Sequence, residues 1–215
     1  MARRRRIGSE TSETRGLLLE CVERLMLDKG YAAVSYRSVA SSANVTPGLV
    51  QYYFPKLDDL FIASIRRYTE RNIERLTAVL EAHREQPLRV LWKYSWDEST
   101  AALTLEYMAL GNHRRSIRSE ITKVTKQVQR IQLEALENAG TDRTTPYALD
   151  LAPPALLFLL TGVPRLLEFY AGFDVTTGRE EVVELIERYL DTVEPTGVGR
   201  ERKRRLPTSR RRSKR

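Results

Sequence analysis

The chain has 215 residues, 41% of them apolar and 30% charged, which is typical of a globular protein with a sizeable core. Its single cysteine, Cys21, excludes an internal disulfide and a multi-cysteine metal site, and two histidines make a histidine-rich metal centre unexpected. The formal net charge is +8. We therefore expect a protein of a reducing, cytoplasmic compartment that needs no cofactor.

The positive charge is concentrated at the two ends. Arg3, Arg4, Arg5 and Arg6 carry four positive charges, residues 200–215 carry nine more net, and the rest of the chain is left with −5. We expect residues 1–9 to form a disordered basic arm and residues 196–215 a disordered basic tail. Basic arms on an acidic body favour a polyanion partner. We favour nucleic-acid contact for the arm and a contribution to solubility alone for the tail.

No segment is expected to enter a membrane. The basic start "MARRRR" is followed by the polar "IGSETSETRG", whereas a secretory signal would continue with an apolar segment. The most apolar run, "LAPPALLFLLTGVPRLL", contains three prolines and a glycine, and its uninterrupted part is too short to span a bilayer.

Apolar periodicity predicts an all-α fold of about nine helices, with no β-hairpin signature. Gly30 ends the first helix, because glycine is the usual residue after a helix C-terminus. Gly140 and Pro146 mark a loop before the last two helices. In chain order the expected helices cover residues 11–29, 36–43, 47–53, 57–82, 87–94, 99–112, 116–138, 155–171 and 179–193.

The two short helices have the pattern of a helix-turn-helix. Ala40 is small enough for a close helix crossing, and Asn44 tolerates the positive φ of a tight turn. Val45 fills the angle between the helices. Thr46 is the expected N-cap of the second helix and Pro47 its first residue, where a missing amide costs nothing.

The second of these helices, residues 47–53, is too short to be stable alone, so neighbouring helices must hold it. Val50 and Phe54 are the expected inward anchors. Gln51 can hydrogen-bond a base edge in the major groove, and tyrosine hydroxyls can donate to phosphates. We therefore interpret Gln51, Tyr52 and Tyr53 as a contact surface. The alternative is that one or both tyrosines pack against the first helix.

The segment "GYAAVSYRSVASSANVTPGLVQYYFPKLDDLF" resembles the N-terminal domain of the tetracycline-repressor (TetR) family of bacterial regulators. The resemblance implies a helix-turn-helix DNA-binding domain at residues 10–56. It also implies a ligand-sensing and dimerisation domain at residues 57–195, reached through the long helix. The family commonly has tyrosine at the position of Gln51 and lysine at that of Leu57. The DNA-contacting residues that it implies, with the arm added, are Arg3, Arg4, Arg5, Arg6, Tyr36, Arg37, Thr46, Pro47, Gly48, Leu49, Gln51, Tyr52, Tyr53 and Lys56.

The DNA-binding unit is not itself basic. Residues 10–67 contain seven basic and seven acidic side chains, yet phosphate contacts supply much of the affinity for DNA. We therefore expect Arg3–Arg6 to supply the missing charge, in the minor groove beside the recognition helix.

Two classes of function compete for residues 68–195: a ligand-sensing and dimerisation domain, or an enzyme or purely structural bundle. An enzyme needs a poised nucleophile, an acid–base pair or a metal site, and none is evident. We therefore expect no enzyme, but a sensor of a small, largely apolar effector. The candidate effector residues are Trp92, Trp96, Tyr107, Met108, Phe158, Arg165 and Phe169. Arg165 and Glu168 could instead pair at a dimer interface.

The last two helices are expected to join two subunits, because the first of them is apolar nearly all round. A homodimer with twofold symmetry matches a palindromic operator. The alternative is that both helices close the core of one subunit. The candidate interface residues are Leu160, Leu167, Val182, Ile186 and Tyr189. The sequence thus predicts a ligand-responsive repressor, with an activator or a DNA-binding protein without an effector as alternatives.

Overall fold

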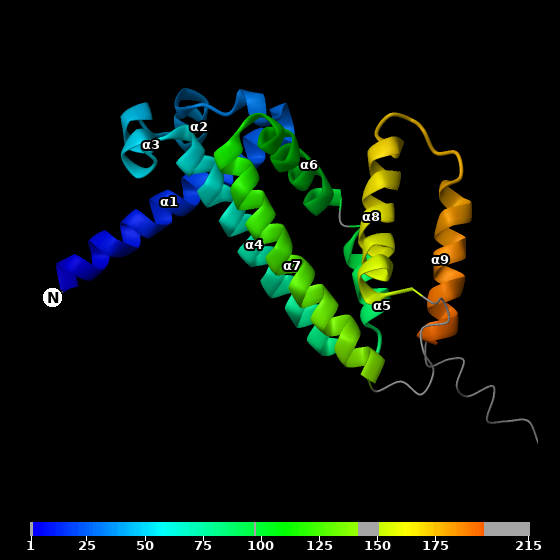
Figure 1. The fold of residues 1–215 in the computed structure, drawn as a ribbon. Coiled ribbons are helices and arrows are strands. Elements are labelled where there is room, and N and C mark those ends of the chain that lie inside the picture. Colours follow the sequence, from blue (N-terminus) through cyan, green and yellow to red (C-terminus); the bar gives the residue numbers. More distant parts are fainter. Residues whose placement is uncertain (1, 97, 142–150, 196–215) are drawn as a thin grey trace, which may run out of the picture.

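The computed structural model describes residues 2–96, 98–141 and 151–195, with side chains placed in 13–96, 101–138 and 151–195. The described residues form helices and no strand (Figure 1). The expected all-α fold is therefore confirmed. The expected loop before the last two helices and the basic tail lie mainly outside these ranges. The elements are α1 (Ala2–Lys29), the 3-10 turn η1 (Tyr31–Ala33), α2 (Tyr36–Ala43), α3 (Pro47–Tyr53), α4 (Leu57–Ala82), α5 (Pro87–Tyr94), α6 (Glu98–His113), α7 (Arg115–Thr141), α8 (Pro153–Ala171) and α9 (Arg179–Val193).

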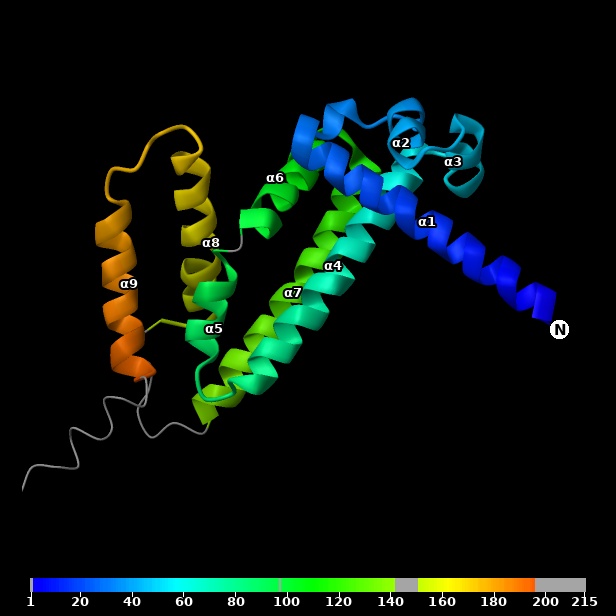
Figure 2. The same ribbon diagram turned by 180° about the vertical axis from the view of Figure 1, so that it is seen from behind.

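Two long helices, α4 and α7, form the axis of the molecule. They lie side by side and run in the same direction, with α1–α3 at one end and the α8–α9 pair beside the other (Figures 1 and 2). The first half of α4 belongs to one apolar core, which includes Leu18, Val50, Phe61 and Leu110. The second half belongs to another core, built with α5, α7, α8 and α9. One continuous helix therefore connects both cores.

The first core does not end at the boundary expected near residue 56. Tyr107 from α6 and Ile117 from α7 are buried in it together with residues of α1, α2 and α3. The Glu106 carboxylate accepts a hydrogen bond of 2.7 Å from the Tyr31 amide, just after α1. Asp58 at the start of α4 is bound by Arg114 and Ser116. The helix-turn-helix unit is thus packed directly against the part of the chain that follows it.

Residues 2–9 form the start of α1, which begins at Ala2 rather than near residue 11. The expected disordered arm is therefore not seen. Alanine and arginine are good helix formers, and the single Gly8 costs only about 1 kcal/mol relative to alanine. The helix is anchored farther along by the buried Leu18 and Met26, so it can extend past its packed part. Figure 1 shows its N-terminal part projecting away from the other helices. The side chains of Arg3–Arg6 lie outside the described ones.

Helix α8 covers the expected residues 155–171 and begins two residues earlier, at Pro153. Pro153 and Pro154 stand at its start, where proline is tolerated, and only Pro164 lies inside it. Its 19 residues make it long and apolar enough to cross a membrane by length and composition, which corrects the expectation that the run is too short. Core helices of soluble proteins pass the same test, and α8 packs on the second core through Leu156, Leu157 and Leu160.

The end of α9 is fastened to the start of α5. Glu194 is only 2% exposed, and its two carboxylate oxygens accept from the amides of Leu88 at 2.9 Å and Arg89 at 2.8 Å. These are among the first amides of α5, which have no partner within that helix. The Arg89 guanidinium also donates to Asp191 at 2.8 Å. A negative charge at a helix N-terminus is stabilising, so this contact fixes α9 on the second core.

Candidate nucleic-acid interface

The turn between α2 and α3 has the predicted geometry. Asn44 adopts the left-handed conformation, with φ 54° and ψ 45°. The Val45 amide donates to the Ala40 carbonyl at 2.9 Å, which closes the end of α2. Ala40 is 1% exposed, so its small side chain lies at the close contact between helices. The roles predicted for Ala40 and Asn44 are confirmed.

Caps and two anchors hold the short helix α3. The Thr46 hydroxyl accepts from the Leu49 amide at 3.3 Å, and Pro47 occupies the first turn. Val50 is fully buried and Phe54 is 2% exposed, as predicted for the two anchors. The other face of α3 is therefore not required for packing.

That outward face carries most of the predicted contact residues. Tyr52 is 76% exposed, so the alternative of packing against α1 is wrong for this side chain. Gly48 has nothing within 4 Å of the position that a Cβ would take, which leaves its backbone open to close approach. Leu49 and Tyr53 are half-buried, and the Tyr53 ring meets that of Tyr52 edge-on at 5.4 Å. The remaining exposed members of the predicted set are Arg37, Thr46, Pro47, Gln51 and Lys56.

Tyr36 does not fit the predicted phosphate contact. Its hydroxyl donates to the carbonyl of Phe54 at 2.9 Å, so its one proton is already used to tie α2 to the end of α3. Burial, with a smaller effect of the Asp59 charge, raises the pKa of this phenol. Tyr36 thus orients the recognition helix, and we correct the expectation that it donates to DNA.

The seven candidate effector residues do not gather at one site. Tyr107 is buried in the first core, where its hydroxyl lies 2.7 Å from that of Ser64. Met108, Phe158 and Phe169 are exposed by 42%, 71% and 44%. Tyr107 therefore lies in a different core from Trp92, and the other three side chains are exposed, so these four residues stay predictions as effector contacts.

The other three candidates lie inside the helical body. Trp92 is 3% exposed, and its ring meets that of Trp96 edge-on at 5.3 Å. Arg165 is half-buried on α8, whereas Glu168, one turn later, forms an ion pair with Arg179 of α9. The two charged residues that the sequence could not distinguish therefore have different surroundings.

The predicted dimer residues belong largely to the core of one subunit. Leu160 is 1% exposed, and Ile186 and Tyr189 pack on the second core, as in the alternative that the sequence left open. An apolar stripe on a helix predicts that other residues cover it. It does not predict whether those residues belong to the same subunit or to a second one. Leu167 and Val182 are half-buried.

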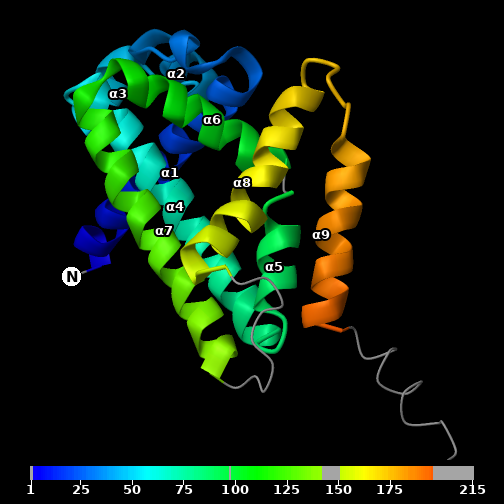
Figure 3. The ribbon, with the colours of Figure 1, turned by 45° about the vertical axis from the view of Figure 1, so that its right-hand side comes forward.

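A different set of apolar side chains of the last two helices faces outward. Figure 3 shows that α8 and α9 stand at one side of the molecule, away from α1–α3. The exposed set is Phe158, Leu159, Leu166, Phe169, Tyr170, Phe173, Val175 and Leu185, which we call the outer patch. Sequence periodicity could have found its α8 members, since they lie opposite the buried Leu157 and Leu160.

Ion pairs between α1, α4 and α7 were not foreseen. Arg66 of α4 holds Glu120 of α7 through two hydrogen bonds of 2.7 and 2.8 Å, and Arg67 binds Glu20 of α1. Hydrogen bonds from Ser116 and Arg114 hold the pKa of Asp58 below its usual range. The partners of each ion pair are about 50 residues apart in the sequence. Local sequence patterns therefore do not predict these ion pairs.

Comparison with known proteins agrees with the geometry of α2 and α3. The family model of bacterial regulatory proteins, tetR family, matches residues 18–64. No curated protein matches the chain.

Solved structures match most of the chain. A member of the TetR family from Streptomyces coelicolor A3 is 26% identical, with a TM-score of 0.57 over 82% of this chain and 98% of that one. A TetR transcription regulator from Haloarcula marismortui is 19% identical, with a TM-score of 0.63 over 85% and 98%. A protein described as a transcriptional regulator from Saccharomonospora viridis, solved in complex with choline, is 20% identical, with a TM-score of 0.65 over 82% and 96%.

Proposed function

This chain is a member of the TetR family of bacterial transcriptional regulators, and from that premise we propose that it is a ligand-responsive repressor. It binds a palindromic operator as a homodimer, and a small effector releases it. The observation that carries the proposal is the outward face of α3, where Gln51 and Tyr52 are exposed on a helix anchored by the buried Val50 and Phe54.

The chemistry of that face suits duplex DNA. The Gln51 amide can both donate to and accept from a base edge in the major groove. Arg37 at the start of α2 and Lys56 at the start of α4 are exposed on either side of α3 and suit phosphate contacts. Arg3–Arg6 add the positive charge that residues 10–67 lack. These groups together supply base readout and phosphate contacts.

The outer patch supports the dimer. Exposed apolar surface gathered on two adjacent helices is a common sign of a protein interface. A symmetric dimer through α8 and α9 joins two copies of α3, as a palindromic operator requires. The interface that we propose therefore uses Phe158, Phe169 and Phe173 in place of Leu160, Ile186 and Tyr189.

The effector response is supported by the path of α4. This helix starts next to α3 and ends in the second core, so a change in the packing of one core reaches the other along a single rigid element. A ligand releases DNA only if it binds the DNA-incompetent state more tightly. Regulators of this family are non-enzymatic, and we propose the same for this chain, in the cytoplasm.

Selection of binding sites from random duplexes by the purified full chain tests the proposal. We expect enrichment of one pseudo-palindromic sequence, whose two half-sites are about one helical turn apart. Recovery of duplexes without a shared sequence would instead identify a nonspecific nucleic-acid binder and contradict the proposal.

A further inference from the structure

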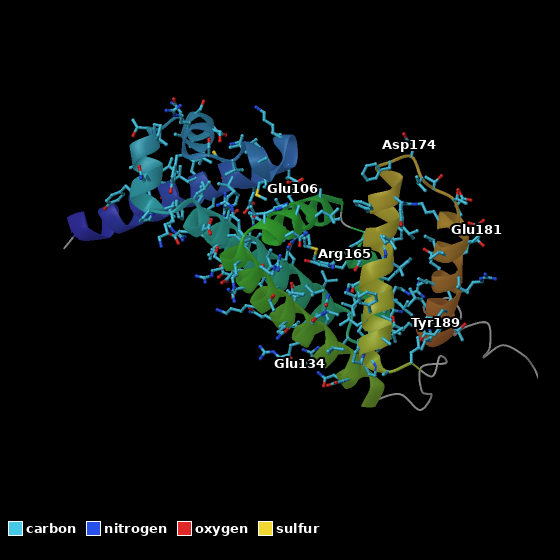
Figure 4. The ribbon with its side chains drawn as sticks, turned by 45° about the horizontal axis from the view of Figure 1, so that its top comes forward. Glu106, Glu134, Arg165, Asp174, Glu181 and Tyr189 are labelled. Atoms are coloured by element: carbon cyan, nitrogen blue, oxygen red, sulfur yellow. The ribbon has the colours of Figure 1, made fainter. Side chains whose placement is uncertain are left out.

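Arg165 lies on α8 between the buried face of that helix and the outer patch. Arg165 is half-buried at the edge of that face: the buried Leu157 and Pro164 lie to one side of it around the helix, and the exposed Phe158 lies to the other. Figure 4 shows Arg165 on the side of α8 that faces α4 and α6. The guanidinium is therefore directed from the edge of the outer patch toward α4 and α5, which carry Tyr68 and Tyr94.

No described residue forms a hydrogen bond or an ion pair with Arg165. Glu168 is the carboxylate one turn away on the same helix, but Arg179 of α9 already binds it. The Arg179 guanidinium also stands 5.0 Å over the Trp96 ring, which fixes that pair in place. An unpaired cation among buried groups is costly, and burial lowers the pKa of Arg165 below its usual range.

The ionisable groups that act on Arg165 are two phenols, Tyr68 of α4 and Tyr94 of α5. The Tyr68 hydroxyl lies 2.8 Å from that of Thr104 on α6, and the Tyr94 hydroxyl donates to the Asn72 carbonyl at 2.9 Å. Both phenols are thus held in position by hydrogen bonds. A phenol is neutral at pH 7, so neither supplies the negative charge that the guanidinium lacks.

We propose that Arg165 binds the carboxylate of an acidic effector, whose apolar body lies among the helices around α8. A guanidinium can hold a carboxylate through two parallel hydrogen bonds, and this pairing removes the cost of the unpaired cation. The one guanidinium that we assign to the effector calls for one negative charge, and the tyrosine rings nearby favour an aromatic or aliphatic body. This inference rests on the proposed function and replaces the largely apolar effector expected from the sequence.

A chain of contacts leads from this site toward the DNA-binding helices. The Tyr68 ring lies 5.7 Å from the Tyr107 ring, and the Tyr107 hydroxyl lies 2.7 Å from that of Ser64 on α4. Arg71, one turn beyond Tyr68, binds Glu23 of α1. A carboxylate that draws Arg165 and Tyr68 together would therefore act on the joint between α1 and α4.

The test is thermal unfolding of the full chain with phenylacetate and decanoate, each compared with its neutral amide and with choline. We expect the acids to raise the Tm of the wild type, and the amides and choline not to. Arg165→Gln should weaken acid binding by about 10- to 100-fold, the usual contribution of a charged hydrogen-bonded pair. The same variant without acid should melt about 2–4 °C higher, because an unpaired buried cation is gone. Arg130→Gln on the exposed face of α7 is the matched control and should change neither result.

Three outcomes would overturn the inference. The first is a wild type that binds no acid better than its amide, and the second is an Arg165→Gln variant that binds acids as the wild type does. The third is a variant that loses dimer mass in light scattering, because Arg165 would then pair with a second subunit. Site selection tests the proposed repressor separately: acid binding that depends on Arg165, without an enriched operator, would keep this site and reject the repressor.

Discussion

The outward faces of α3 and α8 each expose an aromatic residue to a similar extent, Tyr52 by 76% and Phe158 by 71%. Their surroundings differ. Tyr52 lies beside an exposed glutamine on a helix with a polar cap, whereas Phe158 is one of several apolar side chains on α8. The exposure of an aromatic side chain does not by itself distinguish a proposed DNA contact from a proposed subunit contact. We base that distinction on the polarity of the side chains around it. The predictions below separate the two faces.

The largest effect is expected on the α8 face. Phe158→Glu combined with Phe173→Glu places two charges in the outer patch and should give a monomer. The monomer should bind the operator at least about 100-fold more weakly, because the second half-site no longer benefits from linkage to the first. Light scattering and operator titration measure both results. Leu105→Glu, at an exposed leucine of α6 outside the patch, is the control and should leave the dimer intact.

The next effect concerns the positive charge at the start of α1. Deletion of residues 1–6 should reduce the slope of log affinity against log salt concentration by about 2–4. The preferred DNA sequence should stay the same. Four arginines per subunit give an upper bound of about 7 for a dimer. Deletion of residues 200–215 is the comparison and should change the slope less. If only that deletion flattens the salt dependence, the tail and not the arm contacts DNA.

A smaller and more local effect is expected from Gln51→Ala. Loss of the amide should reduce discrimination at one base pair of each half-site by about 1–3 kcal/mol, without a change in dimer mass. Competition binding with single-base operator variants measures it. Gln127→Ala, at an exposed glutamine of α7, should have no effect. Equal weakening on every sequence would assign Gln51 to the phosphate backbone.

The smallest effect is expected at the turn that positions α3. Asn44 has φ 54°, a conformation that costs residues with a Cβ about 1–2 kcal/mol unless, like asparagine, they adapt to it. Asn44→Ala should lower the free energy of unfolding by about 1 kcal/mol, and Asn44→Gly should change it less. Denaturant unfolding of both variants gives the comparison. If alanine proves as stable as glycine at this position, the turn is not held in this geometry.

The sequence predicted α2, α3 and their turn well because the signals are local. The Thr46 cap, the Asn44 turn and the Val50 anchor act within a few residues of one another. The second core was predicted less well, because an apolar stripe such as that of Leu160, Ile186 and Tyr189 does not identify what covers it. The buried pair of Tyr107 and Ser64 joins residues 43 positions apart, and only the fold brings them together.

The contact between Glu194 and α5 has a consequence for the order in which the chain folds. The first core needs no residue beyond Val124, so it can close while the rest of the chain is still being synthesised. The Leu88 amide has its partner only after Glu194, 106 residues later, has been synthesised. At ordinary rates of translation this takes about 5–20 s. Proteolysis of ribosome-stalled chains should find α1–α3 protected before α5. The half of the molecule to which we assign DNA binding would then be folded for a short time before the half to which we assign effector binding and dimerisation.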